Sequence, residues 1–151
     1  MSRFRLYLDS CALSRPLDYP TNEEIRLEAE IVERILGEIY LGRWELVSSD
    51  VLWKEAEAIR DSDKRFMVEG VLMSANVYVT ITVERERRAR ELVAKGVSYF
   101  DALHVACAED GADFFLTVDK RLLKKLDRIP NLRIKAMNPI DFWRDYAEGE
   151  G

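Results

Sequence analysis

The sequence has few of the residues that build disulfide or zinc frameworks. Its 151 residues include only two cysteines, Cys11 and Cys107, and these do not form a CxxC pair. A small secreted domain held by disulfides, or a zinc module, needs more thiols at short spacings. We therefore expect a reduced, cytoplasmic protein with neither a disulfide framework nor a zinc site.

Long apolar runs and an excess of basic charge are also missing. No stretch approaches the roughly 18 consecutive apolar residues of a membrane span, and the first residues, MSRFRLYLD, are too charged and too short for a signal peptide. The net charge of −5 argues against a general nucleic-acid coat, which is usually basic. It does not exclude an enzyme that acts on nucleic acid through bound cations. The length predicts one domain over residues 1–151.

The hydrophobic pattern alternates strand-like runs with helical runs. Strands are expected at residues 4–9, 44–49, 76–82, 113–118 and 132–137. A first helix opens at a capping box of Thr21 and Glu24 and closes before Gly42. Further helices are expected near residues 50–60, 63–74, 83–95, 99–110, 120–129 and 139–147. This alternation favours an α/β fold with a parallel sheet covered on both faces, in which ligands bind at the carboxyl ends of the strands.

Two acids follow predicted strands directly. Asp9 ends the first strand and Asp119 ends the fourth, so both are expected at the carboxyl edge of the sheet. Each also has a purely structural interpretation, because Asp9 could start an Asx-turn and Asp119 could cap the following helix. Taken singly, neither acid indicates a functional site.

Two further acids lie on helices with apolar surroundings. Asp101 follows the capping residue Ser98 and opens the nearly all-apolar helix YFDALHVACAED, where an acid is costly unless a partner neutralises it. Glu55 lies in the middle of an apolar helical face, whereas Glu57 points the opposite way and is a solvated charge. An ionisable group on a core-facing stripe is a candidate site residue.

The four acids together restrict the chemistry. Two carboxylates ~4 Å apart repel by roughly 4 kcal/mol at an effective dielectric near 20, so a converging set must be protonated or hold a cation. Because no cluster of cysteine and histidine is present, an oxygen-only site indicates Mg²⁺ or Mn²⁺. Such ions are typically used in phosphodiester or phosphoryl hydrolysis.

Four stretches of the chain resemble a known family. The sequences LYLDSCALSRP, LVSSDVLWKEAEAI, SYFDALHVACAEDGADFFLTVDKRLL and NPIDFW together are similar to a PIN domain, and more narrowly to small stand-alone, VapC-like PIN proteins related to toxins of toxin–antitoxin pairs. The resemblance implies a three-layer α/β/α sandwich with a mainly parallel sheet. It also implies Mg²⁺- or Mn²⁺-dependent cleavage of single-stranded RNA, and a small antitoxin protein as a partner.

The resemblance carries over onto individual residues. Asp9, Glu55, Asp101 and Asp119 match the acids that the family uses for catalysis and metal binding, and Ser10 matches the hydroxyl residue after the first acid. The chain departs from the family at Cys11, where Asn or Ser is frequent. The main hypothesis is therefore a metal-dependent ribonuclease.

Other residues have both a functional and a structural interpretation. His104, the only histidine, could orient a carboxylate or a phosphate, but a packed ring with local partners is the default. Arg15 is a candidate phosphate contact or a solvent-facing loop residue. A set of large apolar side chains is expected in the core but could also form a homodimer contact: Trp44, Trp53, Phe66, Met67 and Trp143.

Two alternatives to the ribonuclease remain at this point. A Mg²⁺-dependent phosphatase usually has a second Asp two residues after its nucleophile, but residue 11 of this chain is cysteine. A non-catalytic module that binds RNA or a protein would show no metal dependence and would tolerate Asp9→Asn.

Overall fold

The computed structural model describes residues 3–147, in which five short strands form one sheet. The strands are β1 (Arg5–Leu8), β2 (Glu45–Ser49), β3 (Val77–Val79), β4 (Phe114–Leu116) and β5 (Lys135–Met137). Their spatial order is β3-β2-β1-β4-β5, and every neighbouring pair is parallel. The predicted parallel α/β fold is therefore confirmed, and β1 and β4 are adjacent at its centre.

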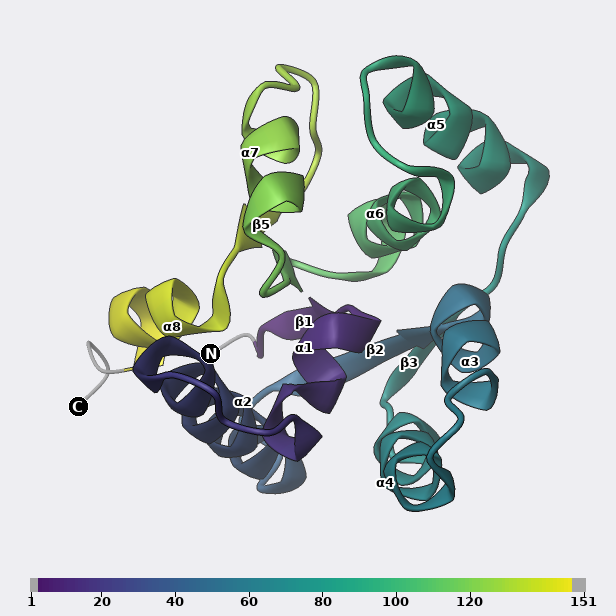
Figure 1. Ribbon diagram of the computed structural model, residues 1–151. Helices are drawn as coiled ribbons and strands as arrows, with labels where there is room; N and C mark the ends of the chain where they lie inside the picture. The colour runs from purple at the N-terminus through teal and green to yellow at the C-terminus, as the bar shows by residue number, and fades with distance from the viewer. Residues whose placement is uncertain (1–2, 148–151) are drawn as a thin grey trace.

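Helices lie on both sides of the sheet, as the resemblance implied. The longer helices are α2 (Glu23–Tyr40), α4 (Ser62–Met73), α5 (Val83–Ala94) and α6 (Tyr99–Gly111). Figure 1 shows α5 and α6 on one side of the sheet and α2 and α4 on the other. Shorter elements complete the chain: α1 (Ser10–Ser14), η1 (Arg15–Leu17), α3 (Asp50–Glu57), α7 (Lys120–Asp127), α8 (Pro139–Phe142) and the π-helical turn η2 (Trp143–Ala147). The architecture is a three-layer α/β/α sandwich.

Side-chain caps fix where most helices begin. The predicted capping box of Thr21 and Glu24 is wrong, because Asn22 is the capping residue of α2 and accepts a hydrogen bond from the backbone N–H of Ile25 at 2.9 Å. Asparagine at this position satisfies one of the free N–H groups of the first turn. Gly42, with φ of 81°, follows the end of α2 in the left-handed region, as glycine readily does.

The core explains the apolar strands. Because both faces of a parallel sheet are covered, successive residues of a central strand are all buried, and this holds for Leu6, Tyr7 and Leu8 of β1. An aromatic cluster joins the C-terminal elements to the amino ends of β1 and β4, and it consists of Phe4, Trp44, Phe114, Phe142 and Tyr146. Trp44 is therefore a core residue, whereas Phe66 and Met67 are exposed on α4.

No helix within residues 3–147 is long and apolar enough to cross a membrane.

Candidate active site at the carboxyl edge of the sheet

Asp9 lies at the carboxyl end of β1 and is only 4% exposed. Its backbone N–H donates to the carbonyl of Leu116 at the end of β4, so the ends of the two central strands meet at this residue. Oδ1 of Asp9 accepts hydrogen bonds from the Ala12 backbone N–H at 3.1 Å and from the Cys11 thiol at 3.0 Å. The acid thus lies at the predicted edge, but it caps the helix α1 rather than starting the Asx-turn that its structural interpretation predicted.

Burial makes the charge on Asp9 costly. Desolvation raises the pKa of its carboxyl above the usual value, and nearby groups, chiefly the Thr117 hydroxyl and the His104 ring, offset only part of this effect. An added cation would favour the ionised form. A buried carboxylate at a strand end is what a cation site needs, and it is what the sequence predicted for this acid.

Glu55 lies on α3, one residue before the buried Ala56 and two before the exposed Glu57. Its side chain is 33% exposed rather than fully buried, and it is bonded to Ser10 of α1 and to His104 of α6. Nε2 of His104 lies 2.6 Å from Oε1 of Glu55, and the Ser10 hydroxyl donates to the same oxygen. The predicted difference between Glu55 and Glu57 is confirmed.

The pKa of Glu55 reflects these contacts. Partial burial raises it, but the hydrogen bonds from His104 and Ser10 outweigh burial, so the pKa lies below its ordinary value. Ser10 and His104 therefore favour the ionised carboxylate, and both contact the same oxygen, Oε1. No hydrogen bond within residues 3–147 uses Oε2 of Glu55.

Asp101 and Asp119 are engaged locally. Asp101 lies in the first turn of α6, and its Oδ2 accepts from the Ser98 hydroxyl at 2.9 Å; Ser98 is the N-cap residue, but its side chain bonds Asp101 instead of a backbone N–H, so the predicted capping box is wrong. Asp119 is exposed and caps α7, because its Oδ1 accepts from the backbone N–H groups of Arg121 and Leu122.

Short chains of contacts connect these acids to Asp9 and Glu55. Thr117, at the end of β4, accepts from the backbone N–H of Asp119 at 3.1 Å, and its hydroxyl lies 3.4 Å from the Cys11 sulfur, which itself contacts Asp9. Asp101 is one helical turn before His104, the partner of Glu55. Asp9 and Asp119 therefore follow the adjacent strands β1 and β4 and are linked through Cys11 and Thr117, while Asp101 lies on the helix that carries His104.

The donor chemistry fits a hard divalent cation, but the side chains do not converge on one point. Carboxylate oxygens are the ligands that Mg²⁺ and Mn²⁺ prefer. Within residues 3–147, however, no three His, Cys, Asp or Glu side chains gather closely enough to hold a metal ion. Asp9 precedes Ser10, which donates to Glu55, while the carboxylate of Asp101 is bonded to Ser98 and that of Asp119 caps α7. The four-carboxylate metal site stays a prediction.

The two predicted substrate-binding residues are paired within the protein. Ser10 donates to Glu55. The Nε of Arg15 lies 3.1 Å from Oε1 of the buried Glu28, and its Nη1 lies 3.1 Å from Oδ2 of Asp18. Arg15 is therefore held against α2 rather than projecting freely into solvent.

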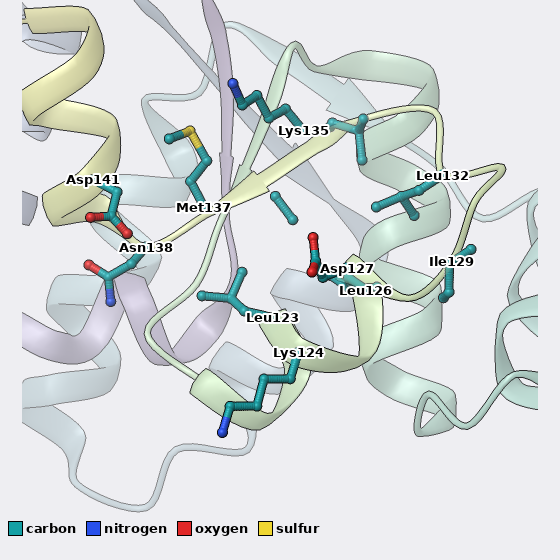
Figure 2. Close-up of a pocket in the computed structure, with 12 residues that line it drawn as sticks. Leu123, Lys124, Leu126, Asp127, Ile129, Leu132, Lys135, Met137, Asn138 and Asp141 are labelled. Carbon is teal, nitrogen blue, oxygen red and sulfur yellow. The ribbon is translucent and has the colours of Figure 1, made fainter.

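A hollow lies elsewhere on the molecule, away from the four acids. It measures about 540 Å³ and lies between α7 and β5, where Leu123, Leu126 and Met137 line it together with Lys124 and Lys135 (Figure 2). None of the four acids lines this hollow. Asp127, Asn138 and Asp141 also line the hollow, but neither carboxylate is one of the four acids that the family resemblance singles out, so the candidate site is placed at those acids.

The sequence interpretation missed three polar residues of this edge. Tyr7 and Ser49 are buried strand residues that look like ordinary β-formers in the sequence, but the Tyr7 hydroxyl lies 2.6 Å from Nδ1 of His104 and 2.7 Å from the Ser49 hydroxyl. Thr117 is the third. The only signal was the T-x-D spacing to Asp119, which pointed to the acid rather than to the threonine.

Comparisons with known proteins agree with this fold. The sequence model of the PIN domain matches residues 6–129. Comparison with curated proteins finds no match. Several solved structures share the fold. DNA-bound VapBC from Salmonella typhimurium is 17% identical, with a TM-score of 0.55 over 90% of this chain and 98% of that chain. FitAcB from Neisseria gonorrhoeae is 16% identical, with a TM-score of 0.54 over 89% and 98%.

A third similar structure is VapBC2 from Rickettsia felis bound to a DNA fragment from its promoter. It is 13% identical, with a TM-score of 0.52 over 89% of this chain and 99% of that chain. At these identities the structures establish the fold alone. The match of the family model over most of the chain goes further, and it shows that this protein belongs to the PIN domain family.

Proposed function

We propose that the protein is a Mg²⁺- or Mn²⁺-dependent endoribonuclease that hydrolyses phosphodiester bonds of single-stranded RNA. The observation that carries the proposal is that Ser10, the residue directly after Asp9, donates a hydrogen bond to Glu55, which brings α3 to the carboxyl end of β1. One carboxylate is buried at the carboxyl end of a central strand, and the other is fixed through one oxygen by Ser10 and His104. A cation between them would neutralise both charges.

Asp9, Glu55, Asp101 and Asp119 would hold the metal. For this, the side chains of Asp101 and Asp119 would leave their present contacts with Ser98 and the first turn of α7. When bound, the cation activates water and stabilises charge that develops on the phosphate. The chain itself buries Asp9 away from water, and it holds Glu55 in place through Ser10 and His104.

RNA as substrate is supported by exposed aromatic side chains beside the acids. Tyr99 and Phe100 immediately precede Asp101, are 43% and 44% exposed, and contact each other edge-to-face with ring centroids 5.8 Å apart. Exposed rings of this kind can stack on unpaired bases, which single-stranded RNA offers. Ser10 and Arg15 would make smaller contributions, because both are already bonded within the protein.

The partner follows from the resemblance to toxin-like PIN proteins. We propose that the chain is the toxin of a toxin–antitoxin pair and that a small antitoxin protein covers the acidic edge. A homodimer contact would use the exposed Phe66 and Met67 on α4, which the core leaves uncovered.

A non-catalytic module on the same scaffold is the second candidate. It is favoured by the lack of three converging metal-ligating side chains within residues 3–147. Such a module would bind RNA or a protein without cleaving either.

One assay separates the two functions. Purified protein is incubated with single-stranded RNA in Mg²⁺ or Mn²⁺, and then with a chelator. The nuclease predicts cleavage that the chelator abolishes and that Asp101→Asn removes. Cleavage that survives chelation, or an Asp101→Asn variant as active as the wild type, would eliminate the metal-dependent nuclease.

A further inference from the structure

A continuous line of hydrogen bonds runs from the interior of the sheet to the carboxylate of Glu55. The Ser49 hydroxyl lies 2.7 Å from the Tyr7 hydroxyl, which lies 2.6 Å from Nδ1 of His104. On the other side of the ring, Nε2 lies 2.6 Å from Oε1 of Glu55. The members come from β1, β2, α3 and α6, and Ser49, Tyr7 and His104 are at most 1% exposed.

The donors and acceptors of this line can be arranged in one consistent direction. A carboxylate only accepts, so Nε2 of His104 must carry the hydrogen that lies between it and Glu55. Nδ1 of the neutral ring is then an acceptor, and it takes the hydrogen of the Tyr7 hydroxyl. The Tyr7 oxygen accepts from Ser49, whose own oxygen accepts from the backbone N–H of Leu52 at 3.2 Å.

The opposite direction leaves two groups unsatisfied. With the hydrogen on Nδ1, the bare Nε2 would face an oxygen of Glu55 lone pair to lone pair. Tyr7 would then donate to Ser49, and the hydrogen of the Ser49 hydroxyl would have no acceptor among residues 3–147. Buried polar hydrogens without acceptors are rare because each loses its bond to water.

We propose that Tyr7 and Ser49 are positioning residues that keep the proton of His104 on Nε2 and so hold Glu55 in its working orientation. The proposal deepens the nuclease function above and rests on it for its catalytic consequence. Ser10 and His104 both bond Oε1 of Glu55. The oxygen that remains available to a bound cation is therefore Oε2. Tyr7 is fully buried and its hydroxyl bonds His104, so it acts on Glu55 through that ring.

The single histidine makes the hydrogen-bond direction measurable. The untagged chain, labelled with ¹⁵N-histidine and free of metal, contains one imidazole ring, and its two nitrogens can be observed by NMR. We expect one protonated nitrogen, Nε2, and an Nδ1 resonance typical of a hydrogen-bond acceptor. A proton on Nδ1, or on both nitrogens, would overturn the proposal. The wild-type spectrum decides this point whether or not any variant folds.

Two tyrosine variants test whether the Tyr7 hydroxyl donates the hydrogen bond to Nδ1 of His104. Tyr7→Phe keeps the ring that stacks on Phe115 but removes the hydroxyl, so the Nδ1 resonance should move towards that of a free acceptor. Tyr78→Phe is the matched control, because the Tyr78 hydroxyl also makes a 2.6 Å hydrogen bond, to Asp50, outside the line. If the Nδ1 resonance is unchanged in Tyr7→Phe, or shifts by the same amount in Tyr78→Phe, Tyr7 is not the donor.

Kinetics on single-stranded RNA then tests the positioning role. Tyr7→Phe should lower kcat by roughly 10–100-fold with an unchanged KM, because the buried hydroxyl does not contact RNA. His104→Gln, whose amide can replace the Nε2–H donor, should retain more activity than His104→Asn. If the wild type cleaves RNA and Tyr7→Phe cleaves it equally fast, the positioning role fails and the nuclease stands. If the wild type cleaves no RNA, the proposed function fails instead, whatever the NMR result.

Discussion

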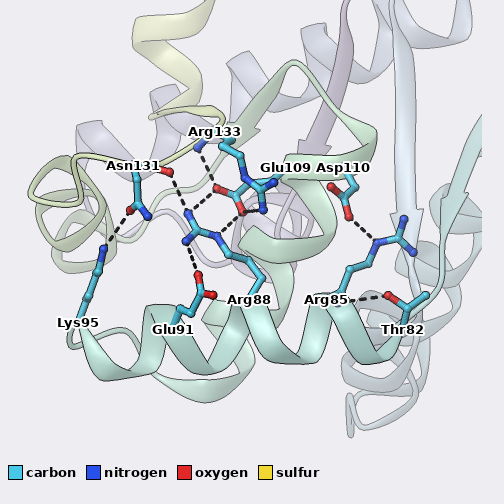
Figure 3. Close-up of polar contacts among 9 residues, drawn as sticks. All are labelled: Thr82, Arg85, Arg88, Glu91, Lys95, Glu109, Asp110, Asn131 and Arg133. Atoms are coloured by element: carbon cyan, nitrogen blue, oxygen red, sulfur yellow. Dashed lines mark hydrogen bonds and ion pairs between the residues drawn. The ribbon is translucent and has the colours of Figure 1, made fainter.

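The guanidinium of Arg88 and the carboxylate of Glu109 form a two-bond ion pair that joins α5 to α6 inside the protein. Nε and Nη2 of Arg88 lie 2.8 and 3.0 Å from the two carboxylate oxygens, and the Glu109 side chain is 0% exposed (Figure 3). Glu109→Gln would leave the buried arginine charge without its buried partner and with only the exposed Glu91 beside it, so the free energy of unfolding should fall by about 3–5 kcal/mol. Urea denaturation measures this loss.

Glu91 provides the matched control. It bonds the same guanidinium through Nη1 at 3.0 Å, but its side chain is 55% exposed. Because solvent screens that contact, Glu91→Gln should cost less than about 1 kcal/mol. Equal losses in the two variants would mean that burial does not decide the strength of these contacts.

Much of the fold could be predicted because its elements have strong periodicity. All five strands and the longer helices lie where the sequence placed them, although the strands are shorter, with β3 covering only Val77–Val79 of the expected 76–82. Apolar residues beyond each strand, such as Ile81, pack against the core without joining the ladder. The five-residue helix α1 was missed because so short an element shows no helical period.

The site was predictable only in part, and for a physical reason. Glu55 was recognisable because a charge on an apolar helical face contradicts its surroundings, and Asp9 because it follows a buried strand. Tyr7 and Ser49 carry no such contradiction, since tyrosine and serine are ordinary strand residues. Their contact depends on the pairing of β1 with β2 and on the packing of α6, which are long-range features.

Replacing the two glutamates of α3 by glutamine, one at a time, distinguishes a carboxylate of the site from one on the surface. Glu55→Gln removes the charge that Ser10 and His104 hold in place, and cleavage of single-stranded RNA should fall by about 100-fold or more. Glu57→Gln alters an exposed side chain two residues away and should leave the rate unchanged. The comparison needs only initial rates in Mn²⁺. A loss confined to Glu57→Gln would mean that the wrong face of α3 forms the site.

Asp9→Asn should stabilise the metal-free protein while abolishing its response to metal. Burial raises the pKa of Asp9 above 3.8, so the stability that the neutral acid contributes is fully present below pH 3.8 and is lost as pH rises through the folded-state pKa. At neutral pH the charged carboxylate is therefore a cost. Asparagine removes the charge, and its amide oxygen can still accept from Ala12. Thermal unfolding without divalent ions should give a higher Tm for Asp9→Asn.

Added Mn²⁺ should then reverse the order of the two proteins. A cation that binds only the folded wild type raises its Tm with concentration, whereas Asp9→Asn should not respond. Asp119→Asn is the control for the cap, because Asp119 also caps a helix but is exposed, and it should give no gain without metal. A wild-type Tm that does not change with Mn²⁺ concentration would contradict a cation site at Asp9.

Cys107 should make the protein sensitive to alkaline pH. The thiol is fully buried in α6, and desolvation raises its pKa from 9.0 to about 12. Above pH 9 the unfolded chain releases this proton while the folded protein keeps it, so stability should fall by about 1.4 kcal/mol per pH unit until the folded-state pKa is reached. Cys107→Ala removes this group, so its unfolding free energy, measured in urea between pH 8 and 11, should decline less steeply than that of the wild type. Parallel curves would mean that the thiolate forms as readily in the folded protein as in the unfolded chain, which burial against the sheet should prevent.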